Sequence, residues 1–259
     1  MKISFVITLY NREKTIVRCL KSITKNFENY LENLEIVIVD DDSSDNSVLE
    51  ARNYLKKYNF SYFIEKNINN FGSNYSKDKG IKKSNGLWSV LLDSDDELCI
   101  NYLELKKYFQ QFSNYKFISF KCKNIHGKKI GNQKEEILFY NFKYYINNFH
   151  KVDEKLDCIK KDECKLSKNC FFDINIHLGC EFLSWAELFR LNGSNVIINK
   201  IARVYHSDSN NQITSISKRK RANDYYYSYK NFFRKYYNEL DYSMIFRLFI
   251  RIFIYKMLK

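Results

Sequence analysis

Short apolar runs alternate with stretches of helical periodicity through the first hundred residues. The apolar runs predict four strands, at residues 3–9, 35–39, 60–65 and 87–92. Helical spacing predicts a helix over 12–25 and a helix after each of the next two strands. A continuous β-branched run such as 35–39 is typical of a strand buried on both faces. We therefore expect an α/β fold with a Rossmann-like, mostly parallel sheet and flanking helices.

Beyond residue 100 the pattern is less regular. It predicts four further elements, a helix at 102–112, a strand at 116–120, a helix at 181–191 and a strand at 195–198. Two helical segments rich in Tyr, Phe, Lys and Arg complete the chain. We expect three regions, which are one half of a domain (1–105), its irregular second half (106–217) and a helical tail (218–259).

Carboxylates follow two of the predicted strands at the point where each ends. Asp40, Asp41 and Asp42 follow the second strand, and the run from Asp93 to Asp96 follows the fourth. In open α/β sheets, ligands bind beyond the carboxyl ends of the strands. Close carboxylates repel each other unless a cation offsets their charge, and hard oxygen donors suit Mg²⁺ or Mn²⁺. An Asp-rich turn with a helix cap explains either cluster alone, but explains both together poorly.

Four motifs, taken in order, resemble glycosyltransferase family 2, which has the GT-A fold. They are Tyr10-Asn11, the run from Asp40 to Asp45, Asn70-Phe71-Gly72 with Gly80-Ile81, and the run from Leu92 to Asp96. The resemblance covers roughly residues 1–105. The chain departs from the family pattern at three places, with Thr8-Leu9 in place of a proline, Asp42 in place of a glycine, and Ser76-Lys77-Asp78 in place of Ala-Arg-Asn.

The resemblance implies a nucleotide-diphosphate sugar as donor, most often a UDP-sugar. By resemblance, Leu9 and Tyr10 line the base, and Asp40 or Asp41 accepts from uracil N3–H. Lys77 would meet the diphosphate, although a solvated helix lysine is an equally good interpretation.

The resemblance also implies a Mn²⁺ or Mg²⁺ ion. Asp95 would be its main ligand, with Asp93 near the ribose or the metal. His206 stands roughly where some relatives place a third ligand, although a lone histidine is more often structural. Asp96 is the weaker candidate, because capping of the following helix explains it.

An inverting transfer needs a general base that deprotonates the acceptor hydroxyl. The resemblance implies an acid at the start of a helix in the second half, and Glu181 matches that position. The alternative is a helix-terminal glutamate that stabilises the helix dipole. Asp173 and Glu187 are the other acids considered for this role, and Trp185 is either an acceptor-sugar platform or a core residue.

The formal net charge of +13 leaves other functions open. Residues 1–100 carry −1, residues 101–217 carry +6 and the last 42 residues carry +8. Lysine beside the tyrosines of 225–230 would suit a nucleic-acid-binding protein, but the carboxylate clusters argue against a nucleic-acid groove. A sugar nucleotidyltransferase would need a Gly-rich phosphate loop near the N-terminus, which Thr8-Leu9-Tyr10-Asn11 is not.

The cysteines and the tail bear on location. Seven cysteines, an odd number, favour free thiols in a reducing cytoplasm, and the spacing of Cys158, Cys164 and Cys170 before His177 disfavours zinc. No apolar run approaches the roughly 20 residues that cross a bilayer. The apolar stretch 244–256, interrupted by basic residues, either packs on the domain or lies on anionic lipid. We expect the second, with the enzyme at the inner face of the membrane and a glycan or lipid-linked glycan as acceptor.

Overall fold

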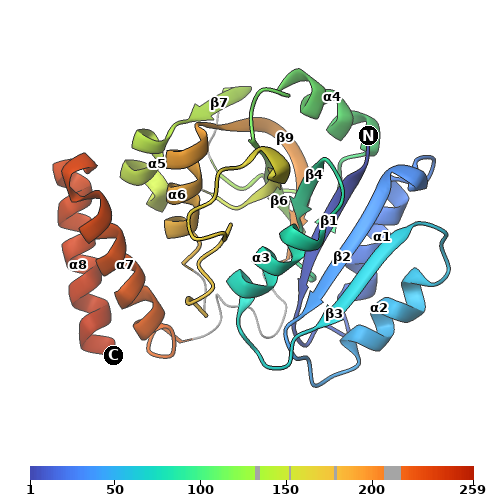
Figure 1. The fold of residues 1–259 in the computed structure, drawn as a ribbon, viewed down its shortest axis with the longest axis horizontal. Coiled ribbons are helices and arrows are strands. Elements are labelled where there is room, and N and C mark those ends of the chain that lie inside the picture. The colour runs from blue at the N-terminus through green and yellow to red at the C-terminus, as the bar shows by residue number, and fades with distance from the viewer. Residues whose placement is uncertain (132–134, 152, 178–179, 207–216) are drawn as a thin grey trace.

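A parallel sheet forms the first half of the molecule (Figure 1). The computed structural model covers residues 1–259 and describes all of them except 132–134, 152, 178–179 and 207–216. Its parallel strands run in the order β3-β2-β1-β4. Their bounds are β1 (Ile3–Leu9), β2 (Leu34–Asp40), β3 (Ser61–Lys66) and β4 (Trp88–Leu91). The four predicted strands are therefore confirmed.

Helices cover both faces of this sheet. They are α1 (Ile16–Asn26), α2 (Ser47–Leu55) and α3 (Ser73–Lys83). Ile3, Phe5 and Ile7 of β1 pack with residues of α1 and α2, whereas Val6 points to the other face, toward α3. A Cβ at Gly80 would lie 2.4 Å from Val6 Cγ1, so the glycine is what lets α3 approach β1 this closely.

The second half continues the same sheet rather than forming a separate one. Within the described residues the sheet has nine strands, and the next ones after β4 are β8, β6, β9 and β5. The bounds are β5 (Glu97–Leu98), β6 (Phe117–Asn124), β7 (Ile137–Tyr140), β8 (Lys155–Ile159) and β9 (Asn195–Tyr205). β8 is antiparallel to β4, and β7 pairs with β9. The sheet is therefore mixed in this half.

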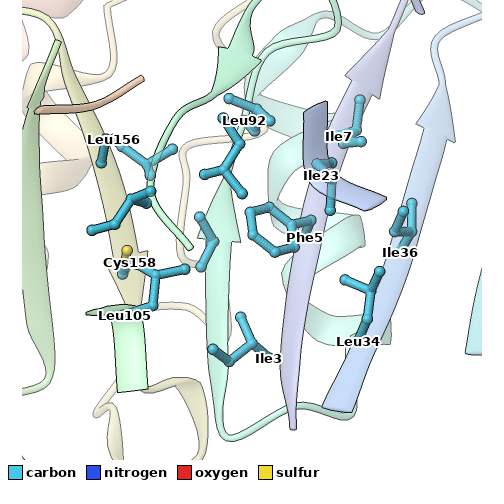
Figure 2. Close-up of a cluster of buried hydrophobic side chains, with 14 of the residues drawn as sticks. Ile3, Phe5, Ile7, Ile23, Leu34, Ile36, Leu92, Leu105, Leu156 and Cys158 are labelled. Atoms are coloured by element: carbon cyan, nitrogen blue, oxygen red, sulfur yellow. The ribbon is translucent and has the colours of Figure 1, made fainter. Parts of the chain in front are cut away.

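Two apolar clusters lie on the two faces of the sheet. The first, shown in Figure 2, joins Phe5 and Ile36 to Leu105 of α4 (Tyr102–Gln111). The second lies under α5 (Phe142–Asn148), α6 (Phe182–Asn192) and the two tail helices. Trp185 and Phe232 belong to this second cluster.

The tail is a pair of helices, α7 (Ala222–Tyr236) and α8 (Tyr242–Leu258), that lie side by side at the edge of the molecule away from β3 (Figure 1). Met244 and Leu248 of α8 are buried in the second cluster. Packing against the domain, one of the two alternatives for the tail, is therefore correct for one face of α8. No helix among the described residues is long and apolar enough to cross a membrane.

Glu187 of α6 ties the domain to α7. Its Oε2 accepts a hydrogen bond from Tyr236 OH at 2.8 Å and lies 2.7 Å from Lys235 Nζ. Arg190 Nη2 lies 2.8 Å from Oε1. Burial alone would raise the pKa of Glu187, but these three donors outweigh it and lower that pKa to about 2.

The depressed pKa makes the contribution of Glu187 dependent on pH. Because the folded-state pKa lies below the unfolded value, the stabilisation is present above about pH 4.5 and is lost as the pH falls toward 2. We expect Glu187→Gln to lower the free energy of unfolding by about 1–3 kcal/mol at pH 7. Urea denaturation measured at pH 7 and at pH 3 should show a smaller difference from wild type at pH 3. Glu28→Gln, at an exposed position, is the control; an equal loss at both pH values would contradict the assignment.

Candidate functional site

A pocket of about 990 Å³ lies at the carboxyl ends of β1 and β4. Its wall includes residues that follow both strands, residues from α3 and α6, and residues from both tail helices. The predicted site residues on this wall are Leu9, Tyr10, Asp41, Lys77, Asp93, Asp95, Glu181 and Trp185. The order of the strands explains this convergence, because β1 and β4 are neighbours and their ends meet at one edge of the sheet.

Asp40 and Asp41 have different surroundings. Asp40 is fully buried, is not among the described residues that line the pocket, and accepts from Ser43 N and Ser43 Oγ. Burial raises its pKa. Asp41 lines the pocket, and its Oδ1 accepts from Asn67 Nδ2 and Phe71 N, both at 2.9 Å. Asp41 Oδ2 accepts one bond from the chain, from Gly72 N at 2.7 Å.

Gly72 is required where it stands. Its φ is +91°, and a Cβ there would lie 2.1 Å from the carbonyl oxygen of His177. Asp42 occupies the family's glycine position with a φ of +66°, a left-handed conformation that aspartate tolerates better than most residues. Its side chain pairs with Lys66 at 3.2 Å, so the unexpected side chain at this turn points to a lysine of β3.

Three predicted residues meet around one ammonium group. Lys77 Nζ of α3 lies 2.5 Å from Glu181 Oε1 and 3.8 Å from Asp93 Oδ1. Asp93 follows β4, and Glu181 directly precedes α6. Burial would raise the pKa of Asp93, but Lys77 and Arg203 outweigh it and lower that pKa to about 2. Asp93 is therefore ionised at neutral pH.

Arg203 of β9 is a site residue that the sequence analysis missed. Its Nη2 lies 2.6 Å from Asp93 Oδ2, and its guanidinium also pairs with Asp96. Asp96 is 1% exposed and accepts from His206 N at 2.8 Å. The helix-capping role considered for Asp96 is wrong, because Asn101 caps α4 through Glu104 N. The available signal for Arg203 was a cation between the apolar residues Ala202 and Val204.

The donor set at Asp95 fits a divalent ion. Asp95 and Asp93 both line the pocket, and an ion that also binds phosphates needs only one or two protein carboxylates. In this structure Arg12 Nε lies 3.3 Å from Asp95 Oδ2.

His206, the other predicted metal ligand, contacts a different carboxylate. Its Nε2 lies 2.8 Å from Glu97 Oε1, and His206 is not among the described residues on the pocket wall. The described residues hold no group of three His, Cys, Asp or Glu side chains that could bind a metal, at the cysteines or elsewhere.

The other candidate acids lie off the pocket. Among the described residues, neither Asp173 nor Glu187 lines it. Asp153, Glu154 and Asp157, which the sequence analysis did not single out, do line it. They come from β8 and the residues before it, a strand that the periodicity did not reveal.

The aromatic residues combine packing with pocket lining. Trp185 is 8% exposed and packs edge-to-face on Phe117 and Phe172, so it is a core residue. It also lines the pocket, and its role as an acceptor-sugar platform stays a prediction. In the tail, Tyr225 stacks on Tyr255 at 5.0 Å, and Tyr225 and Tyr229 line the pocket. These two rings are therefore not an open platform for nucleic-acid bases.

A family model confirms the class of protein that these motifs indicate. The model described as "Glycosyl transferase family 2" matches residues 4–158, more than half of the chain. The protein belongs to this family. Among solved structures, Staphylococcus aureus TarS 1-349 in complex with UDP-GlcNAc has a TM-score of 0.65 to this structure. The match covers 88% of this chain and 66% of that chain at 17% identity, and it shows a shared fold, which is GT-A.

Particular relatives are similar over less than half of the chain. Poly(ribitol-phosphate) beta-glucosyltransferase of Bacillus spizizenii is 40% identical over 96 residues, which are 37% of this chain and 15% of that protein. GalNAc(5)-diNAcBac-PP-undecaprenol beta-1,3-glucosyltransferase of Campylobacter jejuni is 32% identical over 99 residues, which are 38% of this chain and 30% of that protein. The chain thus matches less than a third of the length of either relative.

Proposed function

We propose that this protein is a metal-dependent, inverting glycosyltransferase that moves a sugar from a UDP-sugar to a growing bacterial surface glycan. The observation that carries the proposal is the meeting of Lys77, Asp93 and Glu181 beside Asp95 in one pocket. Family membership supports the reaction class, and the UDP-GlcNAc complex of TarS supports the donor class. The names of the two relatives support an acceptor carried on a polyol phosphate or a lipid.

The nucleotide would bind over the ends of β1 and β2. Tyr10, 43% exposed, offers its ring to the base beside Leu9. A carboxylate has about four acceptor sites, and Asp41 uses three of them for donors among the described residues. The remaining site, on Oδ2, can accept from uracil N3–H. We therefore assign base selection to Asp41 and give Asp40 the role of holding the turn.

Lys77 and Asp95 would act on the diphosphate. Lys77 offers an ammonium group on the pocket wall, and Asp95, with Asp93, would hold Mn²⁺ or Mg²⁺. When bound, the ion would offset the charge that develops on the departing diphosphate. Arg203 keeps Asp93 ionised and fixed in place before the donor arrives.

Glu181 would accept the proton of the acceptor hydroxyl. Its side chain is 30% exposed, so it can reach both the pocket and a substrate. The contact with Lys77 Nζ holds the carboxylate in place on the pocket wall, where a general base would stand. In an inverting transfer the deprotonated oxygen attacks the anomeric carbon as its bond to the diphosphate breaks.

Removing only the proton acceptor should separate binding from chemistry. We expect Glu181→Gln to bind UDP at least as tightly as wild type but to hydrolyse UDP-glucose or UDP-GlcNAc at least about 100-fold more slowly. Calorimetry with UDP, and with CDP for comparison of the base, measures nucleotide binding. Release of free sugar with Mn²⁺ present measures the chemical step. Asp157→Asn, at another acid on the pocket wall, is the matched control. Hydrolysis by Glu181→Gln near the wild-type rate would exclude Glu181 as the base.

The metal proposal is tested by binding rather than by turnover. Wild type should bind UDP more tightly with Mn²⁺ than with a chelator, and Asp95→Asn should lose most of that gain, roughly tenfold or more in affinity. Asp42→Asn changes an aspartate that faces Lys66 and serves as the control. If wild-type affinity for UDP is the same with Mn²⁺ and with a chelator, the metal proposal fails.

The exposed face of α8 supports contact with an anionic membrane surface. Seven apolar side chains recur along it at helical spacing and are each more than 40% exposed, namely Tyr242, Phe246, Phe249, Ile250, Phe253, Ile254 and Met257. We call these residues the α8 stripe. The tail that carries it has a net charge of +8, which favours anionic lipid over a neutral apolar partner. This location would hold the enzyme beside a lipid-linked acceptor.

Because the tail is also part of the core, the membrane test needs point substitutions rather than truncation. We expect the full chain to co-sediment with phosphatidylglycerol vesicles, less so at high salt. The triple substitution Phe246→Ser, Phe249→Ser and Phe253→Ser should abolish this. A control triple at exposed apolar residues elsewhere, Leu49→Ser, Ile68→Ser and Leu103→Ser, should not. Equal sedimentation of both triples would refute a membrane role for the α8 stripe.

A further inference from the structure

The part of the pocket wall near the tail helices, which we call the tail side, differs in chemistry from the part that carries Asp93, Asp95 and Glu181, which we call the carboxylate side. Tyr225 and Tyr229 of α7 and Arg251 of α8 form part of the wall there, with Phe149 and His150 from the segment after α5. All of these residues lie outside the four motifs on which the family resemblance rests. This part of the wall is therefore aromatic and basic.

Arg251 is held toward the pocket by an aromatic ring. Its guanidinium carbon lies 5.2 Å from the centroid of the Tyr229 ring, and its Nη1 donates to the Tyr229 hydroxyl. Of the four other lysines and arginines on the pocket wall, Arg12, Lys77 and Arg203 are each paired with a carboxylate, and Lys155 donates to the Asp153 carbonyl. Within the described residues, no carboxylate lies within the 4 Å ion-pair distance of Arg251. Its charge is thus left for a ligand.

His150 adds two unused hydrogen-bonding atoms. Both of its ring nitrogens are shielded from solvent, and neither has a hydrogen-bond partner among the described residues. Burial, together with the charges of Arg247, Lys151 and Arg251, lowers the pKa of His150. A buried polar atom without a partner is costly, and a ligand that reached either nitrogen would remove that cost.

We propose that Arg251 and His150 bind a phosphate group of the acceptor, which makes the acceptor a phosphate ester. The inference rests on the proposed function, because it concerns the second substrate of the same pocket. A guanidinium binds phosphate oxygens through two parallel hydrogen bonds, and a neutral imidazole donates a third. The rings of Tyr225, Tyr229 and Phe149 offer apolar surface to the group that the phosphate carries. That group is either a lipid chain or a polyol.

Small phosphate esters test the inference on the full chain. Saturating UDP with Mn²⁺ first fills the carboxylate side, so that a phosphate probe can only report on the tail side. Hexyl phosphate represents the lipid source, glycerol 3-phosphate represents the polyol source, and hexyl glucoside is the neutral comparison. Trp185 lies on the pocket wall, so its fluorescence reports binding, whereas Trp88 is buried in the other cluster.

We expect wild type to bind at least one of the two phosphates and to bind hexyl glucoside more weakly. Arg251→Gln should weaken phosphate binding roughly tenfold or more, Arg251→Lys should restore much of it, and His150→Phe should weaken it less. Lys256→Gln removes an equal charge from an exposed position of the same helix and should have no effect. Preference for hexyl phosphate identifies a lipid carrier, and preference for glycerol 3-phosphate identifies a polyol phosphate.

Three results would overturn the inference. They are no binding of either phosphate by wild type, an equal loss in Lys256→Gln and Arg251→Gln, and equal binding of hexyl glucoside. UDP affinity, measured in the same variants, keeps this outcome separate from the proposed function. If wild type fails to bind UDP, the proposed donor is wrong. If UDP binds normally and the phosphate does not depend on Arg251, only the acceptor inference fails.

Discussion

The ion pairs around Asp93 are the interaction on which the two halves of the molecule depend. Arg203 reaches from β9 to Asp93 and Asp96 after β4, and its side chain is only 5% exposed. A charge buried this deeply is strongly destabilising once its partner is removed. The second half of the sheet therefore cannot separate from the first without leaving charges unpaired. Lys77 extends the same network to Glu181, so the charges that hold the fold together also hold the pocket wall in place.

The sequence predicted the parts of the fold that local patterns determine. β1 to β4 alternate with helices, and their apolar runs are short, continuous and bounded by polar turns. β8 was missed because its five residues, KLDCI, include two charged ones, and its place beside β4 depends on residues some 70 positions away. Asn199 and Lys200 interrupt the apolar pattern of β9, so only its first part was predicted.

The site residues divide in the same way, into those that local sequence patterns indicate and those that only the packing of distant segments reveals. Lys77, Asp93 and Glu181 come from distant segments, and the structure brings them together. The resemblance gave each of them a separate role but did not predict this contact. Arg203 and Arg251 belong to no motif, and a basic residue in a strand or a tail ordinarily faces solvent. Only the packing of β9 and α8 shows that these two arginines face the pocket. One face of α8 thus packs on the domain and contributes Arg251 to the pocket, while the α8 stripe stays exposed.

Lys77 both pairs with Glu181 and lines the pocket, and this double position has a consequence for the order of binding. One ammonium group cannot hold Glu181 at 2.5 Å and also give its full charge to an incoming diphosphate. In the proposed reaction, a diphosphate that draws Lys77 away from Glu181 would lengthen this ion pair and release the carboxylate. Glu181 would then be free to contact the second substrate only after the first has bound. Under the proposed function, a lysine shared in this way would impose an order on the two substrates, with the sugar donor binding before the acceptor.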